Sequence, residues 1–500
     1  MLTLAKPAAV VPESAMANAT TNGRRSGAAV FLEVLRSEGG QYVFGNPGTT
    51  ELPLIDALVD APDINYVLAL QEASAVAMAD GYAQAACRPG VLNLHTAGGL
   101  GHGFGNLLNA SVSGTPLVVT AGQQDSRHIL TDPLLYGDLV SIATPAAKWA
   151  REVTHPDQLP ILVRRAFHDC QTAPTGPVFL SLPMDVMEEV TAVDIGEVST
   201  IDRSAVAGSL DRLADYLAAI PPGKLAIIAG DEISASNAAA ETVLLADALG
   251  ARVYGSSWPA HIPYPTAHPL WMGNLPTKAS EIAQKLQGYH AVFALGGKSL
   301  ITILYTETSA VPPGMQIFQI SADARNLGRT YSTKLALVGH VSASLRALLP
   351  LLTPKLADRA KAYAALRKNA EREQEARRAQ LKAAADAEFS NPVITPLVAG
   401  REMARAIGPQ TAIVDEAPAT LGALRISEHR VHPPVFLLAW RGARVGYAGG
   451  GRLLARHRPR AGCLDRRRWR HTTGAVDRLI ARERRGAQRS YQPSGRSTRR

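Results

Sequence analysis

Three short segments near the start of the sequence carry the side chains best suited to chemistry, and each follows an apolar run typical of a buried strand. The first, Gly45-Asn46-Pro47-Gly48-Thr49-Thr50-Glu51, is a turn of glycine and proline that leads into a helix. The free backbone amides at such a helix start can bind a polar ligand. By itself, the pattern is also typical of an ordinary turn between a strand and a helix.

The second segment, Leu70-Gln71-Glu72-Ala73, places a carboxylate between a strand and the small-residue helix predicted over Ser74–Ala86. A buried carboxylate is costly to ionise, so we expect Glu72 to have a raised pKa and to hold or share a proton. The alternative is an acid that only stabilises a helix N-terminus through the helix dipole.

The third segment runs from Asn93 to Gly105 and combines His95 and His102 with five glycines. We expect a loop whose glycines let the backbone approach a flat ligand, with histidines that exchange protons near neutral pH. A dinucleotide site is a poor match, because no GxGxxG followed by a distal acid fits these glycines. The run Gly297-Lys298-Ser299 resembles a phosphate loop, but Val292 stands where that motif needs glycine.

The elements that position these segments alternate between short apolar runs and alanine-rich stretches of helical period. This alternation predicts a parallel sheet covered by helices on both faces, which is an α/β fold. Ligands of such folds bind where strands end, as these segments do. The predicted strands are Tyr42–Phe44, Tyr66–Leu70, Val91–Leu94, Leu117–Thr120 and Val178–Leu182, and the helices between them are Glu51–Val59, Ser74–Ala86 and Leu159–Cys170.

A polar stretch over Glu188–Ser204 separates this unit from a second one of the same kind. From Pro354 to Ala387 the chain is rich in Ala, Lys, Arg and Glu and lacks glycine, which predicts a solvent-facing linker helix. A third unit opens with a helix over Glu402–Ile407 and a strand over Thr411–Val414, which puts Glu416 at a strand end. The strands predicted for the second unit are Leu225–Ala229, Arg252–Tyr254, Ala291–Leu295, Gln316–Ile320 and Leu335–Val338.

The net charge of +9 is unevenly distributed along the 500 residues. Residues 441–500 hold 18 Arg, no Lys and three acids, a net charge of +15, so the first 440 residues carry −6. We therefore expect no nucleic-acid partner, and a basic nucleic-acid-binding arm is the weaker explanation of the tail. The uncharged stretch Val91–Gln124 is broken by glycines and asparagines and does not predict a membrane span.

The cysteines Cys87, Cys170 and Cys463 lie far apart and form no CxxC pair. This spacing argues against a zinc or disulfide framework and favours a reducing compartment. The first 27 residues lack the charged-then-apolar order of a signal peptide, so we expect a disordered leader and a cytoplasmic protein.

Taken together, the three segments resemble the thiamine-diphosphate-dependent 2-oxo acid decarboxylase family, and within it most closely the benzoylformate decarboxylases. The similarity runs from about Ala28 to Trp440 and includes Thr120-Ala121-Gly122-Gln123-Gln124 and Gly176–Pro183. It implies three doubly wound parallel-sheet domains, the third truncated here. The expected ranges are a leader over 1–27, a pyrimidine-binding domain over 28–190, a central domain over 205–352, a linker helix over 354–387, the start of a diphosphate-binding domain over 388–440 and an aberrant tail over 441–500.

The resemblance also implies roles for individual residues. Glu72 matches the glutamate that hydrogen-bonds N1′ of the thiamine diphosphate aminopyrimidine and so promotes loss of the thiazolium C2 proton. His95 and Thr49 match side chains that hydrogen-bond the substrate carboxylate or the developing alkoxide. The other residues expected to contact the cofactor are Asn46, Pro47, Gly48, Gly98 and Glu416.

On the same resemblance, the expected reaction is non-oxidative decarboxylation of a benzoylformate-like 2-oxo acid to an aldehyde, in a homodimer or homotetramer. Ile303 stands where benzoylformate decarboxylases have a second catalytic histidine, which leaves the substrate open. An acetolactate synthase-type carboligase and an inactive scaffold subunit are the alternatives.

The family holds Mg²⁺ and the diphosphate through a Gly-Asp-Gly segment and a later Asn, and residues 441–500 contain no such acid loop. We identify no metal ligand in this chain. Read one frame over, the codons of Asp465 to Trp469 permit Ile-Gly-Asp-Gly, and those of Trp440 and Arg441 require glycine. We therefore predict that the chain is frame-shifted from about Gly442 onward and binds the cofactor poorly.

Overall fold

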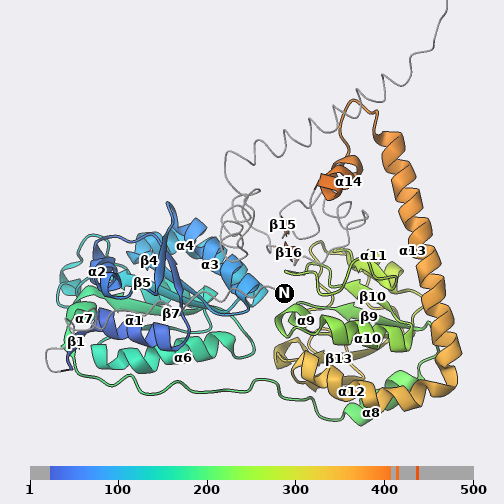
Figure 1. Ribbon diagram of the computed structural model, residues 1–500, viewed down its shortest axis with the longest axis horizontal. Helices are drawn as coiled ribbons and strands as arrows, with labels where there is room; N and C mark the ends of the chain where they lie inside the picture. The colour runs from blue at the N-terminus through green and yellow to red at the C-terminus, as the bar shows by residue number, and fades with distance from the viewer. Residues whose placement is uncertain (1–22, 407–412, 416–434, 438–500) are drawn as a thin grey trace, which may run out of the picture.

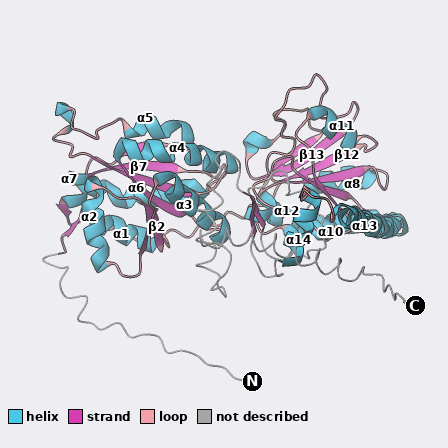
Figure 2. Cartoon of the chain, turned by 90° about the horizontal axis from the view of Figure 1, so that it is seen from above, coloured by secondary structure: helices cyan, strands magenta, loops and turns pink. Residues whose placement is uncertain are grey.

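The computed structural model describes residues 23–406, 413–415 and 435–437. It contains two six-stranded sheets, both fully parallel, in separate lobes (Figure 1). Helices cover both faces of each sheet, as the view from above shows (Figure 2). The α/β fold class predicted from the sequence is therefore confirmed.

The first lobe has the strand order β3-β2-β4-β5-β7-β6. The chain leaves β2 toward β3 on one side and returns to β4 on the other, so a topological switch point lies between β2 and β4. Crevices at such points are where doubly wound folds bind ligands. The strands are β2 (Tyr42–Gly45), β3 (Asn65–Leu68), β4 (Gly90–His95), β5 (Leu117–Gln123), β6 (Ala150–Glu152) and β7 (Val178–Pro183).

Apolar side chains on the two faces of this sheet pack under two groups of helices. One face, around Phe31 and Phe167, lies under α1 (Gly27–Ser37), α2 (Leu52–Ala57), α6 (Leu159–Gln171) and α7 (Met184–Glu188). The other face, around Phe44 and Leu94, lies under α3 (Glu72–Ala86), α4 (Thr96–Ser113) and α5 (Leu139–Ala143). The short strands β1 (Arg25–Ser26) and β8 (Val190–Thr191) pair antiparallel beside the lobe.

The glycine-rich segment after His95 is the helix α4, and the predicted loop is wrong. Glycine in a helix interior costs about 0.5–1 kcal/mol relative to alanine, which is why the sequence favours a loop. Here Gly99 and Gly103 let α4 lie close to α3, because a Cβ on Gly103 would be 3.0 Å from a Val76 methyl. Burial of Leu100 and Leu107 beneath the same helix offsets the cost.

The second lobe has the strand order β11-β10-β9-β12-β13-β14, with its switch between β9 and β12. Its strands are β9 (Leu225–Ala229), β10 (Arg252–Gly255), β11 (Trp271–Asn274), β12 (Ala291–Leu295), β13 (Gln316–Ser321) and β14 (Leu335–Val338). Its helices are α8 (Leu210–Ala219), α9 (Glu232–Ala235), α10 (Ala239–Leu249), α11 (Ala279–Leu286) and α12 (Val341–Leu356). The sequence predicts five of these strands and misses β11, as it misses β6 in the first lobe.

The long helix after the second lobe is α13 (Ala360–Glu388), which starts later than predicted because α12 continues through Pro354 to Leu356. It contacts the second lobe, where Arg367 donates to the Asp247 carbonyl at 2.9 Å and Arg252 pairs with Glu373 at 2.6 Å. Beyond it come α14 (Pro396–Ala406) and the parallel pair β15 (Ile413–Asp415) and β16 (Val435–Leu437). Glu416 and the predicted frame-shifted tail lie outside the described residues. Among the described helices, none is long and apolar enough to cross a membrane.

Candidate active site

The three segments predicted to carry chemistry meet at the carboxyl ends of β2 and β4, at the switch point of the first lobe. The turn after β2 forms a short 3-10 helix, Thr49–Glu51, and α3 and α4 begin with Glu72 and Thr96. The predicted grouping of Asn46, Glu72 and His95 is therefore present. Helix α3 starts two residues earlier than the predicted Ser74, and α2 starts at Leu52, one residue later than the predicted Glu51.

Glu51 is the most completely bonded carboxylate of the group, and it is not among the site residues predicted from the sequence. It is 2% exposed and accepts from the Gly48 amide at 2.7 Å and the Gly122 amide at 2.9 Å. It also bonds the Thr50 hydroxyl at 2.8 Å and His95 Nδ1 at 2.8 Å. Because buried ionised groups persist only when they are paired, this network fixes the turn after β2 against β4 and β5. Position alone could not reveal it, since the Gly122 partner is 71 residues away.

His95 ends β4 with its side chain held by Glu51, and its ring is 23% exposed. An ionised carboxylate only accepts hydrogen bonds, so in this pair Nδ1–H is the donor and Glu51 the acceptor. The Thr50 hydroxyl lies 3.2 Å from the same nitrogen. With Nδ1 occupied, Nε2 is the ring nitrogen left for a ligand.

Glu72 is 8% exposed and sits at the first position of α3. Its Oε1 accepts from Asn46 Nδ2 at 3.0 Å, and its Oε2 lies 3.2 Å from His102 Nδ1. Burial pushes the pKa of Glu72 up, but hydrogen bonds from Asn46, a backbone amide and His102 outweigh it, so the net pKa lies below the usual value. The predicted raised pKa is wrong for this chain, because the sequence shows burial but not the donors that compensate it.

The remaining predicted residues differ in how close they lie to His95. Gly48 lies against the His95 ring, where a Cβ would fall 2.4 Å from its atoms, and Pro47 precedes it in the same turn. Thr49 is exposed at the start of the 3-10 helix. Gly98 is also exposed, on the first turn of α4. In the second lobe, Ile303 is 58% exposed on the long loop that follows β12.

Thr96, directly after His95, has a backbone φ of +50°. A β-branched residue rarely adopts this left-handed region, and strain of this kind is typical of functional sites. Its side chain is fully buried, and its Oγ1 has no hydrogen-bond partner among the described residues. The site therefore contains one buried polar atom that a ligand could satisfy.

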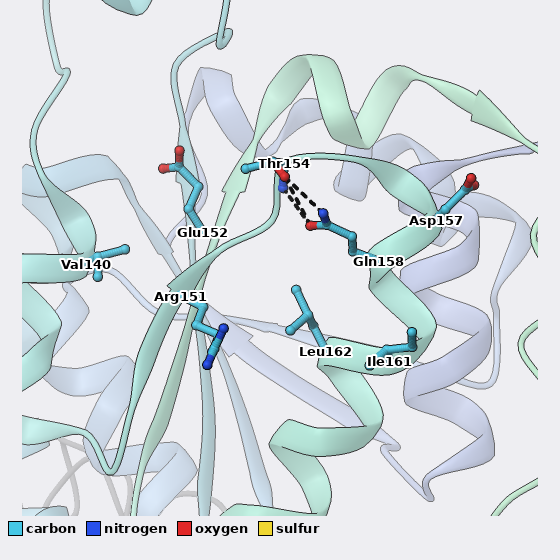
Figure 3. Close-up of a pocket in the computed structure, with 8 residues that line it drawn as sticks. All are labelled: Val140, Arg151, Glu152, Thr154, Asp157, Gln158, Ile161 and Leu162. Carbon is cyan, nitrogen blue, oxygen red and sulfur yellow. Dashed lines mark hydrogen bonds between the residues drawn. The ribbon is translucent and has the colours of Figure 1, made fainter.

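A cavity of about 540 Å³ lies elsewhere in the first lobe, between β6 and the start of α6 (Figure 3). It is lined by Val140, Arg151, Glu152, Thr154, Asp157, Gln158, Ile161 and Leu162. None of the candidate site residues lines it. Its position therefore adds nothing to the chemistry of the switch point.

Comparison with known families decides the identity of these two lobes. The family model described as "Thiamine pyrophosphate enzyme, N-terminal TPP binding domain" matches residues 25–141. The family model described as "Thiamine pyrophosphate enzyme, central domain" matches residues 210–348. The chain belongs to the thiamine pyrophosphate enzyme family. The cofactor that this membership implies is thiamine diphosphate, with the Mg²⁺ typical of the family.

Individual relatives agree with this family. The chain is 31% identical over 328 residues to a benzoylformate decarboxylase of Pseudomonas aeruginosa, covering 64% of this chain and 61% of the relative. It is 25% identical over 365 residues to the mitochondrial acetolactate synthase catalytic subunit of Aspergillus candidus, covering 67% of this chain and 51% of the relative. The matched region therefore spans less than two thirds of either relative.

Solved structures show the same fold. A thiamin diphosphate-dependent enzyme from Mycobacterium smegmatis matches with a TM-score of 0.74 and 27% identity, over 87% of this chain and 80% of its own. The benzoylformate decarboxylase of Polynucleobacter necessarius matches with a TM-score of 0.73 and 26% identity, over 86% of this chain and 77% of its own.

The described residues of this thiamine pyrophosphate enzyme fit the aminopyrimidine side of the cofactor. Glu72 offers an ionised acceptor, and the Thr96 hydroxyl has no partner among the described side chains. The α4 surface beside them is open, because a Cβ on Gly98 or Gly101 would meet nothing within 4 Å. For the metal side, the described residues contain no group of three or more His, Cys, Asp or Glu side chains suited to an ion.

Replacing Glu51 by Gln tests whether its carboxylate holds the site together. The NH₂ group of Gln would face one of the donors that bond Glu51, so two buried donors would be left without an acceptor. We expect the free energy of unfolding to fall by about 1–3 kcal/mol in urea denaturation. The matched control is Glu373→Gln on α13, whose side chain is 59% exposed and which should change stability by no more than about 0.5 kcal/mol. Equal losses in both variants would contradict the assignment.

The lowered pKa of Glu72 makes a prediction about pH. A carboxylate with a depressed folded-state pKa stabilises the fold above its ordinary value of 4.5, and the gain is lost as the pH falls through the folded-state pKa. Glu72→Gln cannot ionise and lacks this contribution. The stability advantage of the natural chain over Glu72→Gln, measured by urea denaturation, should therefore shrink on going from neutral pH to below about 4. An advantage that grows with acidification would show that the pKa is raised instead.

Proposed function

We propose that this chain is a thiamine-diphosphate-dependent enzyme for the non-oxidative decarboxylation of a benzoylformate-like 2-oxo acid to an aldehyde and CO₂. The observation that carries the proposal is Glu72, which is held at the switch point by Asn46 and His102 inside the matched N-terminal domain. When bound, thiamine diphosphate supplies the electron sink for the pair released as CO₂ departs. Together with this function we propose a pyrimidine-binding domain over 28–190, a central domain over 205–352 and the start of a diphosphate-binding domain over 388–440. Two predicted limits change, because Arg25–Ser26 form β1 and the linker helix is α13.

In this proposal the protein contributes placement and proton positions. Glu72 would accept a hydrogen bond from the cofactor's ring nitrogen when that nitrogen is protonated, so the pair would share one proton. The Nδ1 of His95 is hydrogen-bonded to Glu51, so its Nε2 can accept or donate a proton at the substrate's carboxylate or oxygen. Thr49 is an exposed hydroxyl near the same turn and serves as a further hydrogen-bond donor. Pro47, Gly48 and Gly98 shape the wall on which the cofactor lies.

We also propose that this particular chain binds the cofactor poorly. Residues 441–500 contain only three acids against 18 arginines, so they lack the acid loop that holds Mg²⁺ in the family. A frame shift from about Gly442 accounts for this composition. An inactive scaffold subunit that pairs with an intact relative is the alternative outcome of the same loss.

The acetolactate synthase relative supports a second candidate, a carboligase. Both reactions release CO₂ from a 2-oxo acid, but a carboligase joins the remaining fragment to a second 2-oxo acid. The proton-transferring position of His95 favours release of an aldehyde. Separating an aldehyde product from an acetohydroxy acid distinguishes the two reactions.

A homodimer or homotetramer is the proposed assembly, in the cytoplasm. Support comes from the outer face of α4, where Gly98, Gly101 and Gly105 leave open space. Farther along the same face, Leu108 is 37% and Val112 is 68% exposed. A second copy would cover these apolar side chains.

Titration of the chain with thiamine diphosphate and Mg²⁺ tests the function and its impairment together. We expect no Mg²⁺-dependent binding in the micromolar range by calorimetry, and little CO₂ release from benzoylformate. Restoring the alternative frame after Trp440 should recover both, with an aldehyde as product. Micromolar, Mg²⁺-dependent binding by the unaltered chain would refute the impairment, and inactivity of the restored chain would refute the decarboxylase.

Substitution on α4 tests the proposed self-association. Val112→Glu places a charge on the apolar face, and we expect sedimentation velocity to show a shift from dimer or tetramer toward monomer. Val59→Glu is the control, because Val59 is 78% exposed near the end of α2 and should leave the mass unchanged. A monomeric natural chain would exclude this interface.

A further inference from the structure

Three polar side chains form a hydrogen-bonded row across one face of the first sheet. The Tyr66 hydroxyl of β3 donates to Asn93 Oδ1 of β4 at 3.1 Å. Asn93 Nδ2 donates to Thr120 Oγ1 of β5 at 3.2 Å, and the Thr120 hydroxyl donates to the Leu92 carbonyl at 2.9 Å. Asn93 is 1% exposed and Thr120 is fully buried, so neither can exchange these partners for bulk water.

The strand between the ends of this row has a glycine where the row crosses it. β2 separates β3 from β4, and its Gly45 lies beside Asn93 in the sheet register. A Cβ on Gly45 would fall 2.1 Å from the Tyr66 hydroxyl oxygen, so a larger residue would block the path to Asn93. The absence of a side chain at Gly45 is therefore required for Tyr66 to reach across.

The next row along the same face is the candidate active site. Side chains two residues apart on a strand face the same side, so His95 follows Asn93 and Gly122 follows Thr120. His95 and the Gly122 amide are two of the groups that bond Glu51. Burial raises the pKa of Tyr66, and the nearby charge of Glu51 raises it further, so Tyr66 stays a neutral donor.

We propose that Tyr66, Asn93 and Thr120 are positioning residues, which join β3 to β4 and β5 across β2 so that the hydrogen bond from His95 Nδ1 to Glu51 is kept. The role rests on the proposed function in that His95 Nε2 faces the substrate. The row touches neither substrate nor cofactor in this scheme. It acts by setting which nitrogen of His95 carries the proton.

The test measures which ring nitrogen of His95 carries the proton. The full chain, labelled with ¹⁵N-histidine, is studied by NMR without cofactor or substrate, and the His95 signal among the 13 histidines is assigned with His95→Gln. In the natural chain we expect the Nδ1–H tautomer alone. Tyr66→Phe and Thr120→Val should each move the two nitrogen shifts toward each other, which reports a mixture, and Thr120→Ser should restore the natural shifts because it retains the hydroxyl.

Matched controls in the second lobe separate positioning from general stability. Tyr254→Phe and Thr242→Val make the same changes at side chains that are 5% and 0% exposed, and they should leave the His95 shifts unchanged. If Tyr66→Phe does not fold, the Thr120→Val and Thr120→Ser pair decides. An unchanged His95 tautomer in a folded Thr120→Val variant with a lowered Tm, or mixed tautomers in the natural chain, would overturn the proposal. Neither result depends on the cofactor titration, so the two can fail separately.

Discussion

The arrangement of the first lobe depends on one buried negative charge. The idealised cost of taking a carboxylate out of water is on the order of 20 kcal/mol, and several kcal/mol remain after the protein relaxes. Glu51 meets this cost with two backbone amides, a hydroxyl and a histidine from three parts of the chain. Because losing any one partner would leave a buried charge under-bonded, the turn after β2, the end of β4 and the end of β5 have one favourable arrangement.

This constraint explains why residues far apart in the sequence form one site. The switch between β2 and β4 opens a crevice at the carboxyl ends of the strands, and Asn46, Glu72 and His95 project there from three successive connections. The carboxylates of Glu72 and Glu51 differ in their surroundings. Glu72 is buried but bonded to His102, whose side chain is 68% exposed, whereas the Glu51 side chain is 1% exposed and bonded to His95.

Much of this could be predicted from the sequence, and the failures share a cause. Apolar runs identified the central strands, and polar residues after them identified Glu72 and His95. The edge strands β6 and β11 were missed because their side chains are less uniformly apolar. Helix α4, the lowered pKa of Glu72 and the role of Glu51 all depend on contacts from distant segments, namely Val76, His102 and Gly122. Local propensity contains no information about such partners.

The strained backbone of Thr96 has a consequence for how this lobe tolerates change. A backbone held in an unfavourable conformation lowers the stability of the fold by about 1–3 kcal/mol, and contacts of the neighbouring residues must offset this loss. Relaxing it would stabilise the chain, and it would also change the backbone directly after His95. Selection for stability and selection for activity would therefore favour different backbone conformations at this position. A more heat-stable relative would be expected to gain its stability at other positions.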